Sequence, residues 1–105
     1  GQPDAIADGE LLDELLVRRC VGEALDGTLA DTPKTCTQPI DAARQAGLLE
    51  RANRRRFQIW RYLAAKQPSL RMEDVRAEWR RVHLGSVVCG GQVQRADGGW
   101  EAKAC

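Results

Sequence analysis

The sequence predicts a mainly α fold, with three to four helices and a C-terminal β-hairpin, stabilised by disulfides. Apolar residues recur at three- and four-residue spacing in several segments, which is typical of helices with one buried side. Asp97-Gly98 lies between two short alternating runs, which indicates a tight hairpin turn. We expect a single domain over residues 1–105, with a helical part over about 4–85 and the hairpin over about 87–105.

The first predicted helix covers residues 9–19, where four leucines form one apolar stripe. Acidic residues occupy its early turns and two arginines its last turn, as the helix dipole favours. Gly22 and Gly27 interrupt the segment that follows. We therefore expect a turn there, with or without a short helix.

A second, longer helical pattern runs from Thr37, a candidate N-cap, to about Gln67, where Pro68 stops it. We expect Gly47 to bend this helix or to split it in two. Its predicted buried stripe consists of Leu48, Leu49, Ala52, Ile59, Trp60 and Leu63. A third helix is predicted over about 72–83, with Met72, Val75, Trp79 and Val82 on one face.

A two-residue turn at Asp97-Gly98 places Arg95 opposite Trp100 and Val93 opposite Ala102. Cys89 and Cys105 then lie one residue out of register, and a bulge at the neighbouring glycines, residues 90 and 91, would absorb the slip. A lone hairpin is marginal in water, so we expect packing of Trp100 on the helices and a disulfide at the open end.

Four cysteines, Cys20, Cys36, Cys89 and Cys105, fit two disulfides and an oxidising compartment, with four reduced thiols as the alternative. Three pairings are possible, and we favour the nearest neighbours, each of which closes a loop of about 15 residues and contributes about 3 kcal/mol. Closely spaced ligand pairs are missing and His83 is the single histidine, so we expect no metal and no cofactor.

The net charge of +1 hides an asymmetry between the two parts of the chain. Residues 1–31 hold eight acids and two arginines, a net charge of −6, whereas residues 32–105 hold fourteen basic residues and seven acids, a net charge of +7. We expect the acidic part to pack against the basic remainder, which argues against a nucleic-acid partner.

The arginines of the long helix allow two interpretations. Arg51, Arg54, Arg55 and Arg61 could bind an anion, such as a lipid headgroup or a nucleic acid, or could form a solvated face that pairs with the acidic part; we favour the second. Arg56 differs from them because it precedes Trp60 by four residues. It is therefore predicted to lie on the buried stripe and to pair with a carboxylate such as Glu23.

No pattern in the sequence indicates an enzyme. His83 has no candidate nucleophile arranged with it, and neither a phosphate-binding loop nor an H-E-x-x-H motif occurs. We interpret Trp60 and Trp79 as core residues rather than as a ligand platform, and expect Trp100 to be half covered. No segment has the apolar length of a transmembrane helix, and a start at Gly1 is what we expect of a mature chain without its leader.

Three stretches resemble the YdbL-like family of small periplasmic proteins of unknown function. They are VGEALDGTL (21–29), NRRRFQIWRYLA (53–64) and GGQVQRADGGW (90–100), in the family's order and spacing. The positions that carry the resemblance are Gly22, Glu23, Gly27, Asn53, Arg56, Trp60, Val93, Gly98 and Trp100. The chain departs from the family in its cysteines, in Trp60 where Tyr is usual, and in Arg71 where a capping Ser is common.

The resemblance implies a secreted, periplasmic protein that acts as a non-enzymatic accessory or chaperone-like binding protein. The partners it implies are an AsmA-like protein that bridges the envelope for lipid transport and a small outer-membrane lipoprotein. The alternative function is a module that binds an anionic ligand through the arginine-rich helix.

Overall fold

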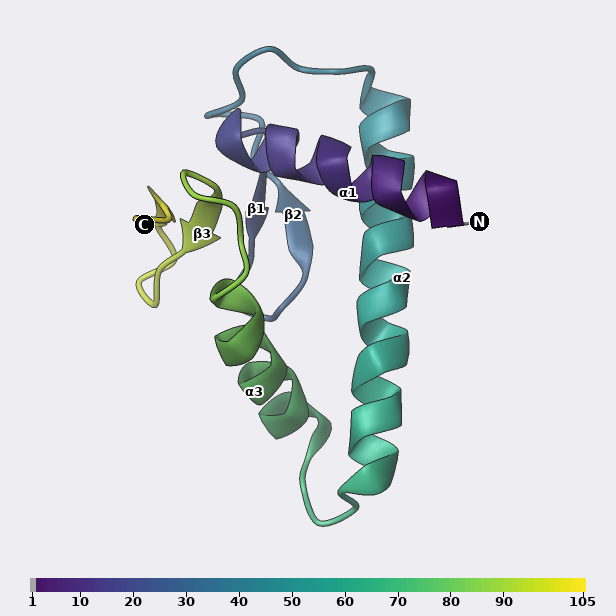
Figure 1. Cartoon of the computed structure of the whole chain (residues 1–105). Coiled ribbons are helices and arrows are strands. Elements are labelled where there is room, and N and C mark those ends of the chain that lie inside the picture. The colour runs from purple at the N-terminus through teal and green to yellow at the C-terminus, as the bar shows by residue number, and fades with distance from the viewer. Residues whose placement is uncertain (1) are drawn as a thin grey trace.

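The computed structural model describes residues 2–105, with side chains from residue 6 onward (Figure 1). The described chain forms three helices and four short strands. The helices are α1 (Gln2–Val17), α2 (Ala42–Lys66) and α3 (Met72–Leu84), and the strands are β1 (Val21–Glu23), β2 (Leu29–Asp31), β3 (Gln92–Gln94) and β4 (Trp100–Ala102).

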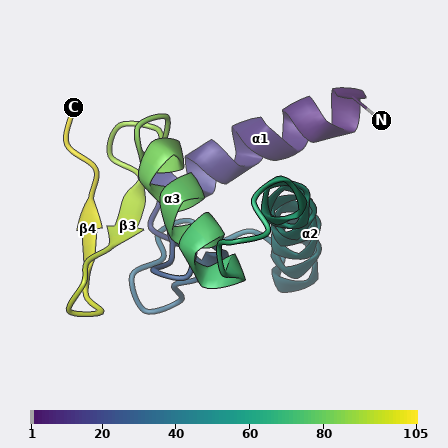
Figure 2. The ribbon, with the colours of Figure 1, turned by 90° about the horizontal axis from the view of Figure 1, so that it is seen from below.

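The strands form one mixed sheet in the order β2-β1-β3-β4, so the prediction of a helical fold with only a C-terminal hairpin is wrong. β1 pairs with β2, and β3 with β4, in antiparallel hairpins. The two hairpins join through a parallel contact in which Glu23 faces Val93. Figure 2 shows α3 between the β3–β4 hairpin and α2, with β4 at the far side of the sheet.

The turn predicted near Gly27 is present, but two strands that were not predicted flank it and no short helix forms there. The loop of this β1–β2 hairpin is built like the loop of the β3–β4 hairpin: the amide of Ala24 donates to Thr28 O at 2.8 Å, as Arg95 N does to Gly99 O at 2.7 Å. Gly27 (φ 91°) and Gly98 (φ 90°) occupy the left-handed position that such a three-residue loop requires. The sequence Asp-Gly therefore lies in the turn of two hairpins, and only the second hairpin was predicted.

The register of the C-terminal hairpin differs from the predicted one by one residue. Gln94 faces Trp100 and Val93 faces Glu101, because the loop has three residues and Asp97 does not adopt positive φ. Trp100 therefore shares a face with Gln94 rather than with Val93. This register removes the one-residue slip between Cys89 and Cys105 for which a bulge was expected. Beyond the paired strands, Gly90 N donates to Lys103 O and Lys103 N donates to Gly91 O, both at 2.8 Å.

The helix boundaries follow caps that sequence reasoning missed. α2 begins after Asp41, whose carboxylate accepts from Arg44 N at 2.9 Å, while the predicted cap Thr37 instead donates its hydroxyl to Arg18 O at 2.9 Å. Gly47 neither bends nor splits the assigned helix. The stop before Pro68 and the third helix lie within one residue of their predicted positions.

The core lies where α1, α2 and the β1–β2 hairpin meet. Its most deeply buried members include Leu15, Leu16, Val21, Leu29 and Leu48. Ile59, which was predicted to be buried, is 42% exposed. Of the residues predicted to share one face of the third helix, Met72 is 40% and Val82 62% exposed. The buried side of α2 includes Arg56 and Trp60, as predicted.

Both predicted disulfides are present, Cys20–Cys36 and Cys89–Cys105. The first ties the residue before β1 to the loop that precedes α2, and the second joins the outer ends of the β3–β4 hairpin. Within residues 2–105, no helix is long and apolar enough to cross a membrane. The two crosslinks are compatible with an extracytoplasmic location.

Gly22 is predicted to tolerate no side chain, because a Cβ there would overlap carbon atoms of the Trp100 ring. Gly22→Ala should lower the free energy of unfolding by about 1–3 kcal/mol, the usual cost of overpacking. Gly9→Ala is the matched control: Gly9 lies in α1 with nothing within 4 Å of the added carbon, and the change should raise stability by about 0.5–1 kcal/mol. Denaturant unfolding of both variants checks the difference in sign, and equal effects would contradict the packing of Trp100 on β1.

Candidate functional site

A buried ion pair connects the sheet to the longest helix. Glu23, at the end of β1, is 2% exposed, and Arg56, in the middle of α2, is 9% exposed. Arg56 donates Nη1 to Glu23 Oε1 at 2.7 Å and Nη2 to Oε2 at 2.9 Å, the bidentate geometry that is strongest for this pair. Nη1 also donates to the carbonyl of Gly27 at 2.8 Å. The predicted pairing of Glu23 with Arg56 is confirmed.

His83 joins the ion pair from the last turn of α3, which the sequence did not indicate. Its Nε2 lies 3.0 Å from Glu23 Oε2 and 3.2 Å from Arg56 Nη2. Because a carboxylate can only accept, we assign a proton to Nε2 that His83 donates to Glu23. The imidazole stacks on Trp79, one helical turn earlier, with ring centroids 4.5 Å apart. We call Glu23, Arg56 and His83 the buried ionic cluster.

The hydrogen bonds of this cluster outweigh the cost of burying its carboxylate. Burial alone raises the pKa of Glu23, but the hydrogen bonds from His83 and Arg56 and the charge of Arg56 lower it, and the net pKa lies below the ordinary value of 4.5. Glu23 is therefore ionised at neutral pH. Each of its oxygens already accepts from a donor of the cluster, so the arrangement is suited to holding the fold together rather than to proton transfer.

Two further arginines fasten α3 to the hairpins. Arg80 donates to the carbonyls of Ala24 at 2.9 Å and Gln94 at 3.0 Å, and so bridges the two hairpins. Arg76 donates Nε and Nη2 to the carbonyl of Asp26, at 3.1 and 2.9 Å. The guanidinium of Arg76 also lies 4.4 Å from the ring centre of Trp60, a cation–π distance.

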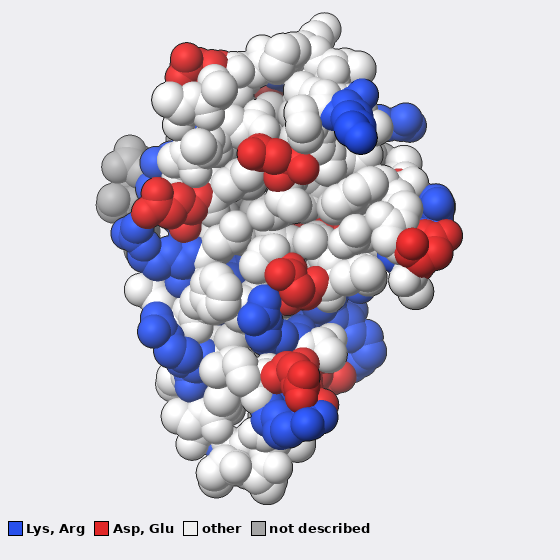
Figure 3. Space-filling model, turned by 180° about the vertical axis from the view of Figure 1, so that it is seen from behind, with Lys and Arg blue, Asp and Glu red and all other residues white. Residues whose placement is uncertain are grey.

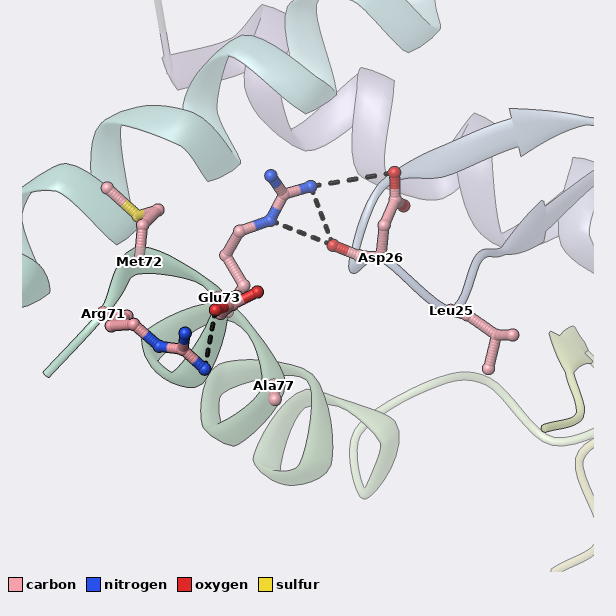
Figure 4. A pocket seen from close by; sticks show the side chains of 7 residues that line it. Leu25, Asp26, Arg71, Met72, Glu73 and Ala77 are labelled. Carbon is pink, nitrogen blue, oxygen red and sulfur yellow. Dashed lines mark hydrogen bonds and ion pairs between the residues drawn. The ribbon is translucent and has the colours of Figure 1, made fainter.

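An open groove of about 590 Å³ lies between the β1–β2 turn and the start of α3 (Figure 4). We call it the α3 groove. It is lined by Leu25, Asp26, Arg71, Met72, Glu73, Arg76 and Ala77. Leu25 and Met72 are 43% and 40% exposed, and in Figure 4 they mark opposite ends of the groove. The ion pair of Arg71 with Glu73 (2.9 Å) lies beside Met72 in Figure 4. Arg76, which also lines the groove, donates to the carbonyl of Asp26. The groove thus offers apolar contacts flanked by charges of both signs.

The residues that carry the family resemblance fall into small contact groups, most of them inside the fold. Glu23, Gly27 and Arg56 meet in the buried ionic cluster. Gly27 also packs against the ring of Trp60, and Gly22 against the ring of Trp100. Asn53 bonds to the backbone of Leu29, Val93 faces Glu23 across the sheet, and Gly98 forms the second turn. None of these contacts requires a partner protein.

The arginine-rich surface of α2 is largely neutralised within the chain. Arg51 pairs with Asp8 of α1 at 2.9 Å, and Arg55 lies 3.8 Å from the same carboxylate. Arg54 pairs with Glu50 at 2.6 Å. Arg61 lies on the same helix, exposed to solvent. The pairs of Arg51 and Arg55 with Asp8 match the interpretation of these arginines as a solvated face opposite the acidic part, and Figure 3 shows basic and acidic groups side by side on one face of the molecule.

Among residues 2–105, no group of three or more His, Cys, Asp or Glu side chains is placed to hold a metal ion. No protein family, curated protein or solved structure matches this chain.

Removing one partner of the buried ion pair is predicted to destabilise the fold strongly. Glu23→Gln or Arg56→Gln alone should lower the free energy of unfolding by about 3–5 kcal/mol, because each leaves a buried charge without its partner. The double variant should lose less than the sum of the two single losses, and the difference measures the coupling. Chemical denaturation of the four proteins in the cycle tests this, and additive effects close to zero would show that the pair contributes nothing to folding.

Stability should also depend on pH through Glu23. Its pKa is lower in the folded chain than the ordinary 4.5, so its contribution is complete above that value and is lost as the pH falls through the folded pKa. The difference in free energy of unfolding between wild type and Glu23→Gln should therefore be constant at neutral pH and shrink in acid. A difference that grows on acidification would mean that the pKa is raised instead.

Proposed function

We propose that the chain is a non-enzymatic, periplasmic accessory protein that binds another envelope protein through the α3 groove. The observation that carries this proposal is the groove itself, where Leu25 and Met72 remain exposed beside fixed charges. An apolar surface with a charged rim is the usual composition of a protein-binding site. The two disulfides suit an oxidising compartment such as the periplasm.

The resemblance to the YdbL-like family supports the choice of partner. We propose that the partner is an AsmA-like protein that bridges the envelope for lipid transport, or the small outer-membrane lipoprotein that accompanies it, and that the chain assists their assembly. The buried position of most residues that carry the resemblance fits this proposal, because they would preserve the scaffold that presents the groove. Glu23 is too deeply buried to contact a partner.

The scaffold beneath the groove is suited to presenting a fixed surface. Arg76 holds the β1–β2 turn against α3, and the buried ionic cluster holds β1 against both α2 and α3. A surface that is fixed before binding loses less conformational freedom when a partner docks. We therefore propose that binding involves little rearrangement of this chain.

Binding should be lost when the apolar side chains of the groove become charged. Leu25→Glu and Met72→Glu are each predicted to weaken binding to the purified periplasmic domain of the AsmA-like protein, or to the lipoprotein, of the same genome by about tenfold or more. Ile59→Glu is the matched control, because Ile59 is 42% exposed on α2 and does not line the groove. Biolayer interferometry with both partners measures the effect. Failure to bind either partner, or equal loss in the control, would overturn the proposal.

A further inference from the structure

The two edges of the sheet differ in how their backbone groups are bonded. At the β2 edge, the side-chain amide of Asn53 accepts from Leu29 N at 2.9 Å and donates to Leu29 O at 3.0 Å. One side chain of α2 thus makes the pair of bonds that a neighbouring strand would make. At Leu29 this edge is therefore closed to a further strand.

The β4 edge has no such cover. Arg95 N donates to Gly99 O, and Lys103 N donates to Gly91 O, so the backbone polar groups of residues 99 and 103 point toward β3. The direction of the N–H and C=O groups alternates along an antiparallel strand. Those of Trp100 and Ala102 therefore point away from β3. Arg95 Nη1 donates to the carbonyl of Trp100 at 3.0 Å, but within residues 2–105 nothing bonds the outward amide and carbonyl of Ala102. Figure 2 shows β4 at the rim of the molecule with no helix beyond it.

The side chains of β4 indicate what would fit this edge. An antiparallel strand centred on Ala102 that belongs to a second copy would place Ala102 opposite Ala102, and Glu101 opposite Lys103 of that copy. The two-fold axis repeats the second pair, so each acid faces a base. Trp100 would lie opposite Ala104, and its ring would not obstruct the second copy, because it packs inward over Gly22 of β1.

We propose that two copies of this chain pair through their β4 strands and continue the sheet across a two-fold axis. Ala102 N and O of each copy would exchange hydrogen bonds with those of the other. The amide of Trp100 would donate to the carbonyl of Ala104 of the second copy, while Arg95 keeps the carbonyl of Trp100. This contact is separate from the α3 groove and does not depend on the proposed function.

The position of Lys103 is compatible with this pairing. Its ammonium group donates to the carbonyls of Gly85 at 3.1 Å and Val87 at 2.7 Å, which fixes the side chain near the inner face of the hairpin. An ammonium group has three donors, so one is left for Glu101 of the second copy. Glu101 is exposed and makes no ion pair within residues 2–105. A partner strand with the opposite charge order would match the edge less well, because like charges would face each other.

Sedimentation equilibrium over a concentration series tests the pairing. The wild type should show a reversible monomer–dimer equilibrium. Ala102→Pro removes the outward amide without removing a bond to β3, and edge positions of this kind tolerate proline. This variant should keep the circular dichroism spectrum and raise the dimer dissociation constant by about tenfold or more. A wild type that stays monomeric, or a dimer that Ala102→Pro leaves intact, would overturn the proposal.

Charge reversal provides a second test that does not depend on the proline. Glu101→Lys places two lysines on each copy, and Lys103→Glu places two glutamates, so neither variant should form its own dimer. An equimolar mixture restores both opposite-charge pairs and should form a mixed dimer. If Lys103→Glu disturbs folding, a mixture of Glu101→Lys with wild type is the alternative test. The mixed dimer would contain one lysine–lysine pair and one lysine–glutamate pair, and should therefore be weaker than the wild-type dimer. Equal dimerisation of Glu101→Lys alone and wild type would show that the strands do not meet in this register.

Discussion

The fold depends on the buried ionic cluster, because Glu23, Arg56 and His83 join three elements at a single point. Glu23 ends β1, the strand that contacts both β2 and β3, and Arg56 lies halfway along α2. His83 reaches the same carboxylate from α3. A buried pair of this kind contributes little net stability compared with apolar packing, but its bidentate geometry allows one arrangement of its partners. The cluster therefore determines how the sheet is oriented against the helices.

Around this cluster, arginine side chains connect the helices to the hairpins, a role that apolar side chains have in larger cores. A chain of 105 residues buries limited apolar surface, and its two hairpins have strands of only three residues. Arg80 bonds to carbonyls at the ends of β1 and β3, and Arg76 bonds to a carbonyl in the β1–β2 turn. Arg76 also covers the ring of Trp60. The Nε1 of Trp60 is buried without a hydrogen-bond partner in the described part of the chain. The stacked guanidinium offsets part of that cost, because the aromatic face attracts a cation.

The sequence allowed the helices, the disulfides and the Glu23–Arg56 pair to be predicted because each leaves a local signal: apolar spacing, cysteine neighbours, and a charge on an apolar stripe. The β1–β2 hairpin was missed because three-residue strands are too short to show alternation. Asp26-Gly27 carries the same turn signal as Asp97-Gly98, but the glycines predict only a turn, with or without a short helix, and not the strands on either side. The role of His83 could not be predicted at all, since it depends on the angle between α3 and β1, and local patterns do not encode that angle.

The charge asymmetry of the sequence is neutralised largely within the chain, and this limits the kinds of surface that the chain can offer to another molecule. In the part of the chain whose side chains are described, from residue 6 onward, acids from the first 31 residues pair with arginines from the remainder at three places: Asp8 with Arg51, Glu23 with Arg56, and Asp26 with Arg76. These contacts place positive charge against negative charge along α2 and α3, and they weaken any field that would attract a polyanion. The two proposed contacts accordingly depend on shape and on short-range interactions rather than on net charge. The α3 groove and the β4 edge both have this character, because each combines an apolar or backbone contact with charges of both signs.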